Sequence, residues 1–189
     1  MSEAITAHAQ TPAKDPIASL AGQVRHASTG ALARLRRFDP VTHPQAALFE
    51  VETMLMAAGV QAHDARQRER WGLVLHCLAL AQGRHDTRAD ADPGAVLARL
   101  RFSESRLRQL VEADDRVLAT LVPRLARRLA AAGASVNWWP LADMLLYVGA
   151  DGEASQARAD AARQRLVRRY LDAKVIVSAA DADAAIEQA

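Results

Sequence analysis

Arginine is the side chain in this sequence with the clearest chemical potential, because it recurs in one local pattern. The segments 34–37, 124–128 and 165–169 each begin with Arg-Leu and end with Arg-Arg. On a helix, positions three or four residues apart share a face, so each segment would present guanidinium groups side by side. A guanidinium is always charged and forms paired hydrogen bonds with phosphate oxygens. The pattern therefore indicates phosphate binding more than catalysis, although taken alone it is more typical of a solvated helix surface than of a binding surface.

The positive charge is concentrated in parts of the chain. The formal net charge of +2 excludes a histone-like polycation. Residues 20–37 contain four arginines and no acid, and residues 99–128 contain eight arginines and four acids. Acidic residues gather in 86–92 and near the C-terminus. This segregation is typical of a protein with a polyanionic partner on one side, or of helices with alternating charge.

Residue types that carry catalysis or hold metals occur without the necessary spacing. The six histidines include no His-x-x-x-His pair, and the single cysteine excludes a Cys-x-x-Cys site. There is no glycine-rich phosphate loop, and no nucleophile, base and orienting group are brought together by their spacing. We therefore expect a protein that is not an enzyme, with no catalytic residue, no bound metal and no cofactor.

The apolar segments indicate a soluble protein. Cys77 lies in the apolar run 73–80, which favours a buried structural thiol and leaves no disulfide within the chain. The N-terminal residues lack the layout of a signal peptide, and no apolar run is long enough to span a membrane. The sequence thus predicts a cytoplasmic protein with no membrane partner.

The three tryptophans, Trp71, Trp138 and Trp139, could stack on nucleic-acid bases. Trp138 begins a segment whose leucines have core spacing, so at least one of Trp138 and Trp139 is expected to pack in the core. We therefore expect backbone contacts through arginine and no base stacking, by Trp71 or by the other two.

The periodicity of apolar residues predicts an all-α fold, an irregular bundle of about eight or nine helices in two packed lobes. Pro16 suits the first turn of a helix, Thr29 and Ser103 suit caps, and Gly59 suits a helix end. Pro123 is expected to interrupt its helix. The expected helices span residues 16–27, 31–38, 45–58, 64–82, 95–99, 103–114, 116–132, 138–148 and 152–174.

Shifts in composition divide the chain into five parts. Residues 1–14 are polar and rich in alanine, and residues 84–93 are polar and acidic, which is typical of a connection between lobes. The expected parts are a disordered N-terminal tail (1–14), an N-terminal helical lobe (15–83), a loop (84–93), a C-terminal helical lobe (94–174) and an acidic tail (175–189).

Four segments of the sequence occur in the order found in one known family. They are residues 30–37 followed by Pro40, 70–83, 96–114 and 136–147. Over about residues 22–170 the chain resembles CasB, the small subunit of the type I-E CRISPR surveillance complex, Cascade. The resemblance implies an all-helical, non-enzymatic protein of antiviral defence. In that family two copies lie beside the guide RNA, and their basic surfaces stabilise the R-loop while base pairing supplies sequence specificity.

The resemblance also implies the partners and the binding residues. The implied partners are the CRISPR guide RNA, the target and non-target DNA strands, the other Cascade subunits and a second copy of the chain. The matching segment 30–37 carries the first basic motif of the family, and the matching segment 96–114 carries its second. Two further helices contribute five more arginines. The predicted nucleic-acid-binding residues are Arg34, Arg36, Arg37, Arg99, Arg101, Arg106, Arg108, Arg127, Arg128, Arg165, Arg168 and Arg169.

Two other functions fit parts of the sequence. Residues 100–110 form a short helix, a tight turn and a capped helix, as in a helix-turn-helix DNA-binding regulator. Against this alternative, only Arg106, Arg108 and Gln109 would reach base edges, and Arg106 cannot share a face with Arg108. A purely structural adaptor remains as a third alternative, for which no arginine would affect nucleic-acid binding.

Overall fold

The computed structural model of the protein describes residues 15–39, 42–43 and 45–187, and within these ranges every regular element is a helix. The predicted all-α class is confirmed. The predicted N-terminal tail 1–14 lies outside the described residues. The α-helices are α1 (Pro16–His26), α2 (Thr29–Arg37), α3 (Leu48–Ala58), α4 (Ala65–Leu80), α5 (Pro93–Arg99), α6 (Glu104–Glu112), α7 (Asp115–Ala131), α8 (Trp139–Tyr147) and α9 (Glu153–Glu187), with a short 3-10 helix η1 (Ala89–Ala91) before α5.

Short polar side chains fix where several helices begin. Each accepts a hydrogen bond from a backbone N–H in the first turn, which satisfies a donor that has no partner within the helix. Thr29 was the expected cap of α2, but the structure uses Ser28, whose hydroxyl accepts from the N–H of Ala31 at 3.2 Å. The other capping side chains are Asp15, Asp64, Asp92 and Asp114.

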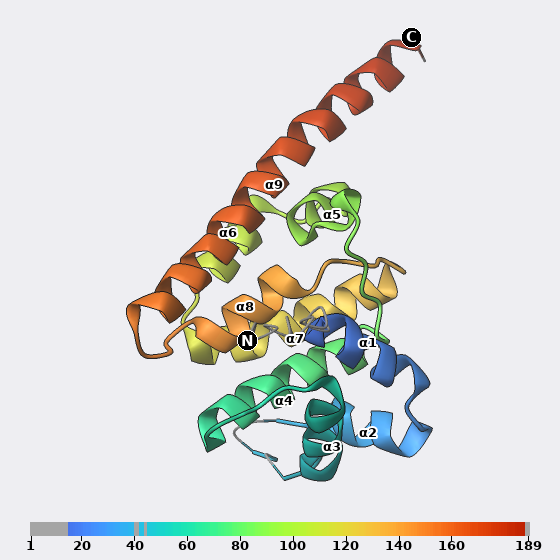
Figure 1. Ribbon diagram of the computed structural model, residues 1–189. Coiled ribbons are helices and arrows are strands. Elements are labelled where there is room, and N and C mark those ends of the chain that lie inside the picture. The colour runs from blue at the N-terminus through green and yellow to red at the C-terminus, as the bar shows by residue number, and fades with distance from the viewer. Residues whose placement is uncertain (1–14, 40–41, 44, 188–189) are drawn as a thin grey trace, which may run out of the picture.

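Helix α4 is the centre of the molecule. The residues from Gly72 to Ala79 are all buried, so the second half of this helix is surrounded on every side. Helices α1, α2 and α3 pack on it from one direction, and α7 and α8 from the other (Figure 1). Helix α9 then covers α5, α6 and α8. The buried apolar side chains form one continuous cluster from Ile17 to Tyr170. The boundaries of the two expected lobes stay a prediction.

Two expected helix boundaries were wrong. Pro123 lies inside α7 without ending it, because a helix tolerates one missing N–H donor when the helix is held by packing, and Pro123 is buried. The last helix does not stop near Lys174 but continues to Glu187, and its C-terminal part projects beyond the rest of the molecule (Figure 1).

The connection between α4 and α5 is held to the start of α8. The N–H of Asp86 donates to the carbonyl of Val136 at 3.1 Å, and the N–H of Asn137 donates to the carbonyl of Ala91 at 2.7 Å. Asp92 is 2% exposed at the end of this connection. The segment expected as a loop between lobes is therefore anchored at both ends to the C-terminal helices.

Candidate nucleic-acid interface

The three predicted arginines of α2 point in different directions. The Nε of Arg34 donates to the Oε1 of Glu50 on α3 at 2.5 Å. The Nε of Arg36 donates to the carbonyl of Ala79 near the end of α4 at 3.1 Å. Arg37 is exposed and forms no hydrogen bond or ion pair within the described residues. Leu35 is buried between them and holds the helix in place. The cluster seen in the sequence therefore divides into one carboxylate-bound arginine and two on the solvent side.

The C-terminal half of α4 brings α2 and α7 together. His76 of α4 is buried, and its Nδ1 lies 2.8 Å from the carbonyl of Leu35, to which the neutral ring donates. Burial lowers the pKa of His76, and the positive charge of Arg127 on α7 lowers that pKa further. Arg127 therefore lies near the same part of α4 that binds Arg36, although the two arginines are far apart in the sequence.

Arg128 extends this basic surface toward the turn between α5 and α6. Its Nη2 donates to the carbonyl of Leu100 at 3.2 Å, and its Cζ lies 5.6 Å from the centre of the Phe102 ring. The turn itself contains Arg101, whose φ of +51° is in the left-handed region that non-glycine residues seldom adopt. Arg101 lies between Leu100 and Phe102, the two residues that Arg128 contacts. Arg128 of α7 is therefore close to the turn that carries Arg101, another of the predicted residues.

We call the exposed residues Arg36, Arg37, Arg127 and Arg128 the arginine track, with Arg101 beside it. Helices α2 and α7 and the end of α5 present it, and these elements lie on either side of the end of α4. Arg124 is also exposed, one helical turn before Arg127 and Arg128. Arg124 begins the Arg-Leu pattern of α7 but was not among the predicted site residues. That sequence pattern is the signal that could have identified it.

Arg165 binds a buried carboxylate, whereas exposed Arg99 binds a backbone carbonyl, as Arg36 and Arg128 do. The Nε of Arg165 donates to the Oδ2 of Asp92 at 2.8 Å, and the other oxygen of this buried carboxylate caps α5 through the N–H of Gly94. Arg99 donates to the carbonyl of Asp90 at 2.5 Å. A guanidinium held by a buried carboxylate has little charge left to attract a phosphate. The contact of Arg34 with buried Glu50 is of the same kind.

The remaining predicted arginines lie on two further helices. Arg106 and Arg108 are exposed on α6, while Leu107 and Leu110 of the same helix are buried. Arg168 and Arg169 are exposed on α9. Within residues 15–39, 42–43 and 45–187, no hydrogen bond or ion pair joins these four to the arginine track. The structure thus places Arg36 and Arg127 at the end of α4, with Arg37 next to Arg36 on α2 and Arg128 next to Arg127 on α7. Nucleic-acid contact by any of the twelve predicted arginines stays a prediction.

Residues 31–171 match the family described as CRISPR-associated protein Cse2. This match covers most of the chain. The protein belongs to the CRISPR-associated protein Cse2 family. The predicted resemblance to CasB, the small subunit of type I-E Cascade, is thereby confirmed, and the chain is a Cascade subunit. Among curated proteins and solved structures, no significant match to the chain was found.

The family match begins in α2, after the buried helix α1, and ends at Leu171. Leu171 directly follows Tyr170, the last buried residue among those of α9 whose exposure the structure describes. The matched Cse2 region therefore contains the whole arginine track and ends where α9 leaves the body of the molecule. Across the described part of the chain, no helix is long and apolar enough to cross a membrane. In the same residues, no three His, Cys, Asp or Glu side chains are grouped as a metal site would require.

Proposed function

We propose that this protein is a non-catalytic subunit of Cascade that binds the sugar-phosphate backbone of nucleic acid through its arginine track. In this role it stabilises the R-loop formed by guide RNA and target DNA and holds the displaced strand. The observation that carries the proposal is the convergence of exposed arginines from α2 and α7 at the end of α4. Membership of the Cse2 family supports it independently.

The chemistry of the track suits backbone attraction without sequence reading. Guanidinium groups on two rigid helices lose little freedom when they bind phosphate, and they carry no information about base edges. In an RNA-guided complex base pairing already selects the target, so a subunit of this kind needs only to favour the open state. Four arginines support only weak binding by the isolated chain, and we expect tight binding within the assembly, beside the other subunits and a second copy.

The salt dependence of binding tests the proposal. Each phosphate contact on a single strand contributes about 0.7 to the slope of log affinity against log salt. Arg37→Ala combined with Arg127→Ala should therefore lower that slope by about 1.4. Fluorescence anisotropy of a labelled random single strand, measured between about 50 and 200 mM salt, gives the slope.

A matched control removes two arginines elsewhere. Arg68 and Arg88 are exposed and paired with Glu52 and Asp86, so replacing both by alanine makes the same change in net charge. The control should leave the slope unchanged. Equal slopes in the track variant and the wild type would exclude the track as the binding surface.

The same assay separates the alternatives. A helix-turn-helix regulator would bind a duplex operator about a thousandfold or more above random duplex. A structural adaptor would show no dependence on any arginine. The proposal predicts weak binding to single strand and duplex of any sequence, lost together when the track is removed.

A further inference from the structure

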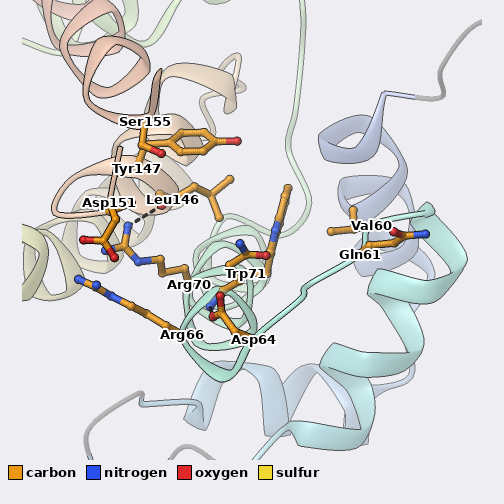
Figure 2. A pocket seen from close by; sticks show the side chains of 12 residues that line it. Val60, Gln61, Asp64, Arg66, Arg70, Trp71, Leu146, Tyr147, Asp151 and Ser155 are labelled. Atoms are coloured by element: carbon orange, nitrogen blue, oxygen red, sulfur yellow. Dashed lines mark hydrogen bonds between the residues drawn. The ribbon is translucent and has the colours of Figure 1, made fainter. Parts of the chain in front are cut away.

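A cleft of about 420 Å³ lies at the other end of α4 from the arginine track (Figure 2). The first two turns of α4 form one wall, and the end of α8 and the beginning of α9 form the opposite wall. Its volume is in the range of small-molecule binding sites. Nothing in the predicted function uses this cleft, and the one lining residue that the sequence analysis considered by number, Trp71, was expected not to stack on bases.

Arg70 of α4 has an unused hydrogen-bond donor at this cleft. Only 9% of the residue is exposed, and its Nη1 donates to the carbonyl of Leu146 at 2.5 Å. Its Nη2 is buried without a hydrogen-bond partner within the described residues. The nearest carboxylate oxygen, Oδ2 of Asp115, lies 3.7 Å from Nη2, beyond hydrogen-bond distance. Asp115 thus offsets part of the charge of Arg70 as an ion-pair partner without satisfying this buried donor, which is costly.

Arg66 adds a second guanidinium one turn earlier on the same face of α4. Its Nη2 donates to the carbonyl of Gly149 at 2.6 Å and lies 3.4 Å from the same Asp115 oxygen. Two guanidiniums therefore share one carboxylate. Asp64 and Asp151 also line the cleft, but one oxygen of Asp64 caps α4 and neither residue is within ion-pair distance of the two arginines.

The walls beside the two arginines are aromatic and amide side chains. Trp71 follows Arg70 on α4, and Tyr147 faces it from α8 (Figure 2). Both rings are partly buried, and the guanidinium of Arg158 lies 4.3 Å from the centre of the Tyr147 ring. Gln61 and Gln67 supply amide donors and acceptors. A planar group with polar edges and an attached anion matches this lining.

We propose that the cleft binds one nucleotide unit, with its phosphate on Arg66 and Arg70 and its base against Trp71 and Tyr147. The charges of Arg66 and Arg70 attract the phosphate, and guanidiniums favour paired hydrogen bonds with phosphate oxygens. An aromatic wall accepts any base, because every base has a π-face. The inference goes beyond the proposed function, since the arginine track contacts the backbone alone. A free nucleotide and an unstacked nucleotide of a strand share this chemistry.

Tryptophan fluorescence of the full chain measures binding directly. Adenosine 5′-monophosphate should give a saturable change, and ribose 5-phosphate should bind about tenfold more weakly because it lacks the stacking base. Comparing the affinity for a single strand of about ten nucleotides with that for the mononucleotide shows whether the cleft binds a nucleotide of a strand or a free nucleotide. Loss of the signal in Trp71→Phe but not in Trp139→Phe assigns it to the cleft.

Two variants of α4 provide a matched pair. Arg66→Ala should weaken binding of the nucleotide, or of the strand if only the strand binds, by about tenfold. Arg68→Ala removes the same charge from the same helix, but Arg68 pairs with Glu52 on α3 and does not line the cleft. It should change the affinity less than twofold. Arg66→Lys keeps the charge without the planar fork and should restore only part of the affinity.

Each outcome decides the proposal. Equal affinities in Arg66→Ala and Arg68→Ala, with unchanged thermal melting, would overturn it. Equal binding of adenosine 5′-monophosphate and ribose 5-phosphate would also overturn it, since the base would then lie outside the cleft. If these tests fail while Arg37→Ala with Arg127→Ala still lowers the salt slope, the track remains as the backbone site and the cleft is excluded.

Discussion

The arginines of α7 and those of α9 follow the same sequence pattern but differ in what surrounds them. In α7, Arg127 is exposed and has no carboxylate partner within the described residues. In α9, the first arginine of the pattern, Arg165, is held at 2.8 Å by Asp92, which is 2% exposed. The comparison shows that an arginine pattern supplies charge and spacing, whereas a neighbouring buried carboxylate decides whether that charge is available to a partner.

The two regions also differ in what they do for the fold. Asp92 caps α5 and binds Arg165 at once, so this pair joins α5 to α9. Between the two helices Gly94 allows the backbones to approach closely. The arginine track instead covers the surface at the end of α4, where the core beneath it is complete without the charges. Stability and binding should therefore respond to different arginines.

The largest effect is expected where α5 meets α9. A methyl group added at Gly94 would lie 2.3 Å from the carbonyl oxygen of Leu166 and 2.7 Å from the nitrogen of Tyr170. Because both atoms belong to the backbone, the helices must separate, and Gly94→Ala should lower the free energy of unfolding by about 3 kcal/mol. Chemical denaturation measures this change.

Gly22→Ala is the matched control for this substitution. Gly22 lies inside α1, and a methyl group there meets nothing within 4 Å. The change should raise stability by up to about 1 kcal/mol, because alanine favours helix more than glycine does. Destabilisation of similar size at Gly22 and Gly94 would contradict the close approach of α5 and α9.

A smaller effect distinguishes an arginine that is bound by a buried carboxylate from an arginine of the arginine track. Arg165→Ala leaves the buried carboxylate of Asp92 without its charged partner. Because Arg165 is half exposed, we expect a loss of about 2 kcal/mol of stability, less than for a fully buried pair. Arg37→Ala should cost less than about 0.5 kcal/mol but weaken binding to single strand. Urea denaturation and anisotropy on both variants measure stability and binding. A larger loss of stability in Arg37→Ala than in Arg165→Ala would contradict the comparison.

The smallest effect concerns His76 beneath the arginine track. Burial and the charge of Arg127 lower its pKa in the folded state, so below about pH 6.5 the unfolded chain binds a proton that the folded protein does not. Stability is then lost as pH falls below about 6.5, by no more than about 1.4 kcal/mol per pH unit for this one group. Burial also lowers the pKa of His85, which acts in the same direction.

Denaturation at about pH 6.5 and about pH 5.5, compared with His76→Gln, isolates the contribution of His76. The variant should show a smaller loss of stability on acidification. Arg127→Ala should also reduce the loss, because it removes a charge that lowers the pKa of His76. A pH dependence that changes in His76→Gln but not in Arg127→Ala would show that Arg127 lies too far from His76 to influence it.

Much of the fold was predictable from local signals. Gly59 ends α3 in the left-handed conformation, Asp64 and Asp92 begin α4 and α5, and the apolar spacing of Leu107 and Leu110 places α6 on the core. Errors arose where packing overrides local preference. Pro123 is carried inside α7, and α9 continues past Lys174 through a run of valine and isoleucine.

The candidate site was predictable in kind but only partly in its members. The charge, the planarity of guanidinium and the absence of catalytic spacing all follow from residue types. The carboxylate partners of Arg34 and Arg165 did not follow from residue types, because Glu50 and Asp92 are 16 and 73 positions away in the chain. The cleft beside Arg70 was also hidden, since its walls come from α4, α8 and α9.

The sequence by itself determined the all-α class, the family and the amount of arginine on each helix, because these depend on periodicity, on ordered segments and on composition. Only the tertiary structure decided which arginines face solvent and which are bound by a carboxylate. The physical reason is that the electrostatics of a side chain depend on distance and burial in space, and contacts such as that of Arg128 with the carbonyl of Leu100 form only when α7 and α5 are packed.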